Sequence, residues 1–170
     1  MEPTAVAIDL GATSARFAVG RLRDGQIVSE VITQRPHSPV EGIGRITWDF
    51  AALMTLAGDA FGYAQAQGPE TTVGIDSWGV DHGFMGPDGL VQSPVAYRDP
   101  SHQAAFERLS EHQAMLYAGT GIQHQPFNTI YQLAARAQDQ PSLIGLDWLL
   151  TPDLIGALLT GVRHTELTMA

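Results

Sequence analysis

Three short apolar runs at the start of the chain, separated only by turn-length gaps, restrict its fold more than any other feature. The first is AVAIDL (5–10), which is followed by Gly11 and has the length of a buried strand. RFAVGRL (16–22) and QIVSEVIT (26–33) come next, with Arg23-Asp24-Gly25 between them. An Asp-Gly pair suits a hairpin turn because glycine accepts a positive φ without steric penalty. The chain is therefore expected to open as a three-stranded antiparallel meander.

A helix and a further strand are expected after the meander. Residues 35–44 contain two prolines and two glycines and are expected to form a loop. Asp49 is then a candidate N-cap, and apolar residues recur behind it at helical spacing until Gly68-Pro69: Phe50, Leu53, Ala57, Ala60, Phe61 and Ala64. Another buried strand is expected at 71–76, and a second hairpin around Pro87-Asp88-Gly89, between GFM and LVQSPVAY.

From residue 101 onward the pattern becomes helical. Helices are expected at 101–118, 128–139, 143–149 and 152–160, the last ending at Gly161. This order of elements indicates one α/β layered domain, in which helices flank a mixed sheet. The final residues, GVRHTELTMA, contain no closing element. Either this tail is frayed or the chain stops in the middle of a domain.

The charge of the chain excludes several classes of partner. The net charge is −9, and all nine basic residues are arginines, scattered singly along the sequence. Nucleic-acid binding and binding to anionic membranes both need clustered cations, so neither is expected. The absence of cysteine excludes disulfides and thiolate metal clusters. The N-terminus lacks the features of a signal peptide, and the apolar run at 154–159 is far shorter than the roughly 20 residues of a membrane span. A cytoplasmic protein is expected.

The segment DLGATSAR (9–16) is the first candidate site. Backbone N–H groups in such a turn can form an anion-binding concavity, and Gly11 lets a phosphate approach the main chain closely. Thr13 and Ser14 add hydroxyl donors. Asp9 has the same sign of charge as phosphate, so its natural role is to hold Mg²⁺ against the phosphate oxygens. An ordinary turn in which Asp9 accepts hydrogen bonds from turn amides fits the spacing equally well.

The segment GIDSWGVD (74–81) is the second candidate site. Asp76, Trp78, Gly79 and Asp81 lie at the end of a buried strand, where α/β folds place ligands. The indole of Trp78 could pack against a sugar ring while Asp81 accepts hydrogen bonds from sugar hydroxyls. A core tryptophan with acids that cap the loop is the alternative, and the residues alone slightly favour it.

Two later segments are weaker candidates. Arg98 and Asp99 could clamp a polyol, or could form a structural salt bridge. The segment 121–132 is rich in amides and aromatic residues, and could line a polar pocket or cap the helix that begins near Asn128. The six histidines show no HxxxH or HxH spacing, so a zinc site is not expected. GxSxG, P-loop and GxGxxG motifs are also absent from the sequence.

In this order, the segments resemble the N-terminal part of the FGGY carbohydrate kinases, which have an actin-like, ribonuclease-H-type fold. The matching stretches run along nearly the whole chain: VAIDLGATSAR, ITWD, GIDSWGVD, PVAYRD, GIQHQPFNTIYQL and TPDLIGALLTG. The resemblance implies this fold for residues 1–170, with ATP and Mg²⁺ as cofactors and a ketose as the small-molecule substrate.

The resemblance also implies roles for particular residues. Asp9 would serve the Mg²⁺ ion, and the phosphate-binding residues would be Gly11, Ala12, Thr13, Ser14, Ala15 and Arg16. The sugar-binding residues would be Trp78, Gly79, Asp81, Arg98 and Asp99. Two positions depart from the family pattern. Ala15 replaces a usual glycine, and its methyl would crowd the turn if that position needs a positive φ. After Asp99 the chain reads Pro100-Ser101-His102, where the family commonly has a further arginine.

Kinases of this family close two domains over a cleft, and their catalytic aspartate lies beyond the matched stretch. The resemblance therefore places this general base, and the second domain, beyond Ala170. The chain alone is expected to have negligible kinase activity, because phosphoryl transfer depends on positioning and on exclusion of water.

Two other hypotheses come from different classes of function. One is a non-catalytic sugar- or nucleotide-binding module. The other is a nuclease that uses Asp9, Asp76 and Asp81 around two metal ions. The net charge of −9 argues against the nuclease, whose substrate is a polyanion.

Overall fold

The expected meander forms most of the main sheet in the computed structural model, which describes residues 4–42 and 44–169. β1 (Thr4–Leu10), β2 (Ser14–Arg23) and β3 (Gln26–Pro36) pair antiparallel in chain order. Asp24 and Gly25 have φ values of 49° and 75°, as a two-residue hairpin turn of type I′ requires. β6 (Thr72–Ser77) lies parallel to β1, so the strand order is β3-β2-β1-β6. The expected mixed sheet is confirmed.

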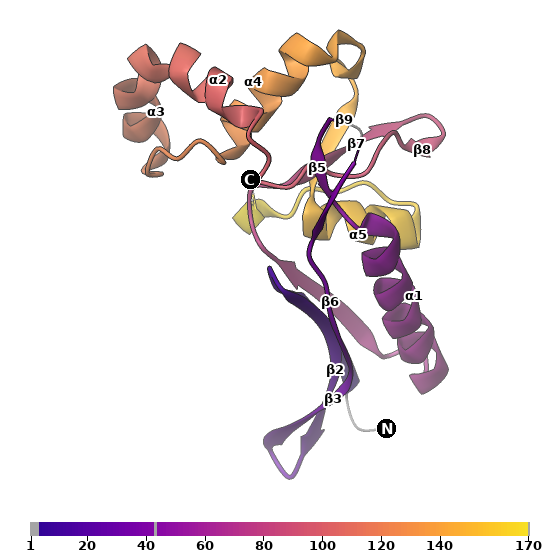
Figure 1. The fold of residues 1–170 in the computed structure, drawn as a ribbon. Coiled ribbons are helices and arrows are strands. Elements are labelled where there is room, and N and C mark those ends of the chain that lie inside the picture. Colours follow the sequence, from indigo (N-terminus) through magenta and orange to yellow (C-terminus); the bar gives the residue numbers. More distant parts are fainter. Residues whose placement is uncertain (1–3, 43, 170) are drawn as a thin grey trace.

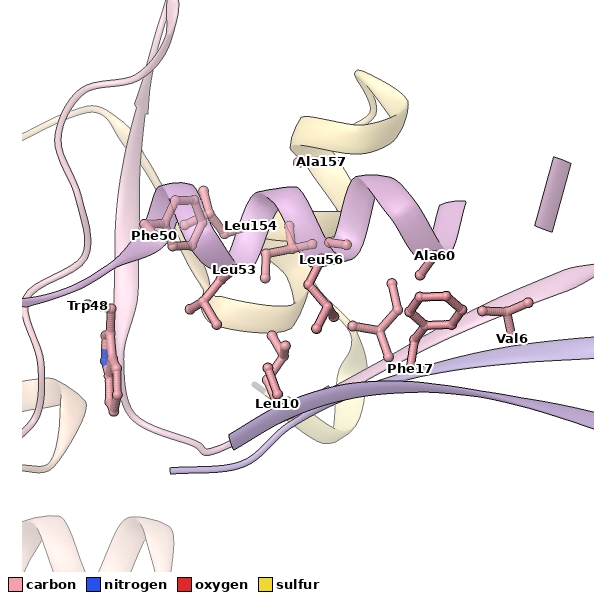
Figure 2. Packing of buried hydrophobic residues seen from close by; sticks show 14 of the residues in the cluster. Val6, Leu10, Phe17, Trp48, Phe50, Leu53, Leu56, Ala60, Leu154 and Ala157 are labelled. Carbon is pink, nitrogen blue, oxygen red and sulfur yellow. The ribbon is translucent and has the colours of Figure 1, made fainter. Parts of the chain in front are cut away.

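Helix α1 (Phe50–Gln67) covers one face of this sheet (Figure 1). It begins where the sequence predicts, because the Asp49 carboxylate accepts a hydrogen bond from the backbone N–H of Ala52 at 3.1 Å. It ends at Gly68, whose φ of 118° favours glycine. Figure 2 shows the core between helix and sheet, formed by buried side chains that include Val6, Leu10, Phe17, Phe50, Leu53, Leu56 and Ala60.

A second, three-stranded sheet has the order β8-β7-β9. β7 (His82–Gly86) turns into β8 (Gly89–Leu90), so the expected second hairpin forms, although its second arm has only two residues. The chain beyond β8 leaves the hairpin, and Val95 forms an isolated bridge with Thr47. β9 (Asp147–Leu150) pairs antiparallel with β7 and leads directly into α5 (Thr151–Thr160). Helix α5 ends at Gly161, as expected, with a φ of 75°.

Two expectations about the connecting segments are wrong. The stretch 143–149 is not helical: a short 3₁₀ turn, η2 (Pro141–Leu143), is followed by β9. Pairing with β7 decides the conformation there, and a short apolar run does not distinguish a helix from a strand. The stretch 35–44 is not simply a loop, because it contains the end of β3 and also β4 (Pro39–Glu41), which pairs with β5 (Ile46–Trp48). Residue 43 lies outside the described residues.

Residues 102–139 form a helical arm at the opposite end of the molecule from the β2–β3 hairpin (Figure 1). The expected helix at 101–118 is divided into α2 (His102–Arg108), η1 (Ser110–His112) and α3 (Gln113–Thr120). The division lets α2 pack on α4 (Thr129–Asp139) over a small core of Ala105, Tyr131 and Ala135, whereas α3 buries no residue.

The C-terminal tail is not extended to its end, because its last described residues form the 3₁₀ turn η3 (Leu167–Met169). Ala170, beyond which the resemblance places the catalytic aspartate, lies outside the described residues. The location of that aspartate therefore stays a prediction. Within residues 4–42 and 44–169, no helix is long and apolar enough to cross a membrane.

Replacing Leu56 by alanine is expected to lower the free energy of unfolding by about 2–5 kcal/mol, because this fully buried side chain would leave a cavity under α1. In the same helix Gly58 is exposed, and nothing lies within 4 Å of the position of an added Cβ. Gly58→Ala is therefore expected to raise the free energy of unfolding by about 1 kcal/mol. Urea denaturation of both variants measures these changes, and a loss in both would contradict the described orientation of α1.

Candidate functional site

The turn between β1 and β2 is tight and is closed by the backbone. The N–H of Gly11 donates to the carbonyl of Ser14 at 2.9 Å, and a Cβ on Gly11 would lie only 3.2 Å from that oxygen. Ala15 does not have a positive φ: among the described non-glycine residues, only Asp24 and Val80 do. Its methyl group is buried in the core under α1. The departure from glycine at this position therefore does not crowd the turn.

Three charged side chains project from the main sheet beside this turn. Asp9 lies opposite Arg16 in the β1–β2 register and beside Asp76 in the β1–β6 register. Side chains alternate along a strand, and the neighbours of Asp9 in β1 are buried under α1. All three charged groups are therefore on the face away from α1. The Nε and Nη2 atoms of Arg16 lie 2.7 Å and 2.6 Å from Oδ2 of Asp9, and both side chains are partly exposed.

His37, which the sequence analysis did not single out, contacts the same turn. Its Nε2 atom lies 2.7 Å from the carbonyl oxygen of Gly11, and its backbone N–H donates to the carbonyl of Thr13 at 3.0 Å. A carbonyl oxygen can only accept, so Nε2 carries the proton in this contact. The register that pairs Ser14 with Pro36 brings His37 here. No sequence motif marks this residue, because its position depends on how far β3 extends.

Asp81 lies at the centre of a buried hydrogen-bond cluster. Its Oδ2 atom accepts the indole N–H groups of Trp48 at 2.6 Å and Trp78 at 2.9 Å, and also the backbone N–H of Tyr97 at 3.1 Å. Its Oδ1 atom accepts from Nε2 of Gln132 at 2.9 Å. Burial raises the pKa of Asp81 above its ordinary value of 3.8, although these hydrogen bonds oppose the shift. The carboxylate is fully buried and lies behind the surface that Trp78 presents.

The backbone around Asp81 is strained and tightly held. The N–H of Asp81 donates to the carbonyl of Gly79 at 3.1 Å, and Val80 between them has a φ of 75°. This is the rare form of γ-turn, and a β-branched residue at this φ is unfavourable. Thr151 holds the turn through its N–H and its hydroxyl, each 3.0 Å from the carbonyl oxygen of Asp81. The hydroxyl of Thr129 donates to the carbonyl of Val80 at 2.9 Å. Such strain persists where surrounding contacts enforce it, as at many ligand sites.

Aromatic rings extend from the Asp81 cluster toward solvent. The rings of Trp48 and Trp78 are 4.1 Å apart between centroids, and Tyr97 lies 6.1 Å from Trp48. Phe127 meets Tyr97 edge-on at 6.1 Å. The exposed guanidinium of Arg98 lies 5.4 Å from the centre of the Tyr97 ring, and its Nε donates to the tyrosine hydroxyl at 3.2 Å. Ring faces and a hydrogen-bond donor are thus available side by side.

Arg98 and Asp99 do not act as a pair. The Asp99 carboxylate is buried, and it accepts backbone N–H groups from Ile46 at 2.6 Å and Ser101 at 2.9 Å. Burial on its own would raise the pKa of Asp99, but the hydrogen bonds from Ser101 and Ile46 outweigh it and lower the pKa. Its ion-pair partner is Arg45, at 3.8 Å. Arg98 therefore faces outward, whereas Asp99 holds the backbone beneath it.

The three acids of the nuclease hypothesis do not gather around a common point. Asp81 is enclosed in its cluster, while Asp9 and Asp76 lie on the open face of the main sheet. Within the part of the chain that the structure describes, no group of three histidine or acidic side chains could hold a metal ion. The two-metal arrangement of Asp9, Asp76 and Asp81 is therefore wrong.

Comparison with known proteins finds relatives that are longer than this chain. No family model matches the chain. The rhamnulokinase of Bacteroides thetaiotaomicron is 36% identical over 178 aligned positions, which span 100% of this chain and 36% of that protein. The rhamnulokinase of Enterococcus faecalis is 37% identical, over 98% of this chain and 35% of that protein. The chain thus spans about a third of the length of the curated relatives it matches.

Solved structures share the fold at lower identity. A carbohydrate kinase from Novosphingobium aromaticivorans has a TM-score of 0.80 at 21% identity, over 97% of this chain and 35% of that one. A xylulose kinase from Rhodospirillum rubrum has a TM-score of 0.76 at 18% identity, over 96% and 36%. The chain has the fold of the actin-like sugar kinases and covers about a third of each. Within this class its sequence is that of a relative of the rhamnulokinases, and the resemblance to the FGGY carbohydrate kinases is confirmed.

Substitutions at Val80 test the strain in the γ-turn. Glycine tolerates a positive φ and alanine does not, so Val80→Gly is expected to be more stable than Val80→Ala by about 1 kcal/mol. Both variants lose the valine side chain, so the difference between their free energies of unfolding reports the backbone strain. Thermal and urea unfolding of the two proteins measure it. A more stable alanine variant would show that the turn is relaxed.

The burial of His82 predicts that the stability of the protein depends on pH. Its ring is buried against Phe84 and Trp148, and burial lowers its pKa from 6.5 to about 4. The folded state favours the neutral ring, so the contribution of His82 is fully present above pH 6.5 and is lost as the pH falls towards 4. The loss amounts to at most about 3–4 kcal/mol. Urea unfolding across this range is expected to show a shallower pH slope for His82→Gln than for the original protein, with His112→Gln, at an exposed position, as the matched control.

Proposed function

We propose that the complete protein is an ATP-dependent sugar kinase that phosphorylates L-rhamnulose on its 1-hydroxyl, and that this chain supplies the first phosphate loop and part of the sugar site. The observation that carries the proposal is an identity of 36–37% to proteins named rhamnulokinase along nearly the whole chain. A related ketose such as fuculose or xylulose is the alternative substrate. The reaction would take place in the cytoplasm, as part of L-rhamnose breakdown.

The turn at 11–14 has the features that a phosphate loop needs. Gly11 has no side chain to shield its backbone, the side chain of Thr13 is exposed, and that of Ser14 is partly exposed. Arg16 brings a guanidinium to the same edge of the sheet, and a guanidinium pairs well with phosphate oxygens. In the complete enzyme, the residues that bind the phosphates of ATP would be Gly11, Ala12, Thr13, Ser14, Ala15 and Arg16, with Ala15 acting through its backbone.

Asp9 and Asp76 fit the requirements of a magnesium ion. Their carboxylates share one face and one register position of the sheet, and Mg²⁺ is usually held by one or two carboxylates together with phosphate oxygens. When bound, Mg²⁺ would neutralise charge on the phosphates during transfer. Oδ2 of Asp9 pairs with the guanidinium of Arg16 at 2.6 Å, so a bound Mg²⁺ would replace the guanidinium at this oxygen and release Arg16 towards the phosphates.

The sugar would lie against the aromatic side of the site. Trp78 offers a ring face, Gly79 is exposed and leaves room above the backbone, and Arg98 offers donors. Asp81 and Asp99 are also assigned to the sugar site. Because both carboxylates are buried, their role is to hold Trp78 and the backbone on either side of Arg98 in place.

The general base that removes the proton from the sugar hydroxyl is assigned to an aspartate beyond Ala170, in line with the family resemblance. The chain alone is accordingly expected to transfer no phosphate. The first experiment measures the intact mass of the natural gene product and its ATP-dependent phosphorylation of L-rhamnulose. A product much heavier than 18.3 kDa that turns over rhamnulose supports the proposal. A natural product of 18.3 kDa that is inert towards ketoses would leave a binding module instead.

In the active protein, Asp9→Asn is expected to lower kcat by about 100-fold or more, because the neutral amide no longer holds Mg²⁺ against the phosphates. Asp24→Asn is the matched control, since Asp24 is exposed in the β2–β3 turn, at the other end of β2 from the phosphate turn, and asparagine tolerates its positive φ. Steady-state kinetics with varied Mg²⁺ measure both variants. Equal activity of the two variants would remove Asp9 from the mechanism.

A further inference from the structure

His37 connects two parts of the site that the proposed function treats separately. One is the phosphate turn, residues 11–14. The other is the tryptophan pair, Trp48 and Trp78. The His37 ring lies 5.4 Å from the Trp48 ring and 5.7 Å from the Trp78 ring, while its Nε2 atom contacts Gly11 at 2.7 Å. One side chain therefore touches both.

On the side of the turn, His37 fixes the orientation of peptide groups. Its ring N–H holds the carbonyl of Gly11 and its backbone N–H holds that of Thr13. In a trans peptide the C=O and the following N–H point in opposite directions, and none of the described peptide bonds is cis. The N–H of Ala12 is therefore directed away from His37. A shift of the imidazole would rotate this donor, which the proposed function assigns to phosphate.

On the other side, the tryptophan pair is held so that it cannot move freely. Both indole N–H groups donate to the same oxygen of Asp81, at 2.6 Å and 2.9 Å, and the two rings are 4.1 Å apart. A displacement of His37 against these rings is opposed by two hydrogen bonds to a buried carboxylate. The contacts thus run without a gap from the turn through His37 and the indoles to Asp81.

We propose that His37 is a positioning residue that couples the phosphate turn to the tryptophan pair, so that an anion bound at the turn changes the surroundings of Trp48 and Trp78. The inference rests on the proposed function for the role of the turn. Because coupling between two sites is reciprocal, an anion at the turn and a sugar against Trp78 would each change the affinity of the other by the same factor, about fivefold at the lower end of typical couplings.

Tryptophan fluorescence of the 170-residue chain tests the coupling, with Mg²⁺ and inorganic tripolyphosphate as the probe. The background variant is Trp148→Phe, which removes the third tryptophan, lying in β9, and leaves the pair as the reporters. Binding of tripolyphosphate is followed independently by ³¹P NMR. In this background, tripolyphosphate is expected to bind and to change the emission of the pair.

Two variants separate the contacts of His37. In His37→Gln, an amide N–H can still reach the Gly11 carbonyl but no ring touches the indoles. In His37→Phe, a ring remains but the donor is lost. The glutamine variant is expected to bind tripolyphosphate about as well as the background protein and to lose most of the emission change. The phenylalanine variant is expected to lose both binding and response.

The outcomes of this experiment distinguish a failure of the coupling from a failure of the phosphate turn. Binding of tripolyphosphate to the background protein without a change in emission would overturn the coupling and leave the phosphate turn in place. A full emission change in His37→Gln would overturn the role of the ring, and the coupling with it. Absence of binding to the background protein would overturn the coupling, because it removes the anion at the turn, while the kinase proposal would still be decided by the phosphorylation of L-rhamnulose. Circular dichroism of each variant confirms that the comparison is made between folded proteins.

Discussion

The candidate site depends on one oxygen atom, Oδ2 of Asp81. Taking a carboxylate out of water costs several kcal/mol unless hydrogen bonds replace its hydration. Two indole N–H groups and one backbone N–H supply them at 2.6–3.1 Å. These donors come from β5, from the loop after β6, and from the turn before the helical arm. Three segments far apart in sequence are therefore held around a single acceptor, and the aromatic side of the site is built on them.

This arrangement separates two kinds of surface along one edge of the molecule. Asp9, Asp76 and Arg16 present charge from the open face of the main sheet, where an anion and its cation would be bound. The rings that surround Asp81 present apolar faces with a few donors, which suits a molecule bearing hydroxyl groups. Because β6 runs into the strained turn that leads to β7, the two surfaces are joined by a short piece of backbone that several hydrogen bonds hold.

The meander, α1 and β6 could be predicted from the sequence, because each depends on residues close by in the chain. These are the Asp-Gly pair of the turn, the Asp49 cap and the apolar runs of the strands. It failed at β9, whose conformation is decided by pairing with β7, more than sixty residues earlier in the chain. The positions of Asp9 and the turn followed from the strand ends. The inward orientation of Asp81 did not, although the indole N–H groups of Trp48 and Trp78 signal a need for acceptors. His37 could not be found from sequence, because only the β2–β3 register brings it to Gly11.

The helical arm has a consequence for the motions of the site. Its own apolar core is small, and it is tied to the rest of the molecule by polar contacts such as Gln132 to Asp81 and Arg45 to Asp139. A unit with few buried apolar contacts opens at a lower free-energy cost than the domain as a whole. Its backbone amides would therefore exchange with solvent earlier than those of the main sheet. Such an opening would separate Phe127 from Tyr97, so the rings around Asp81 would become accessible from one side while Asp9, Asp76 and Arg16 stay in the folded sheet.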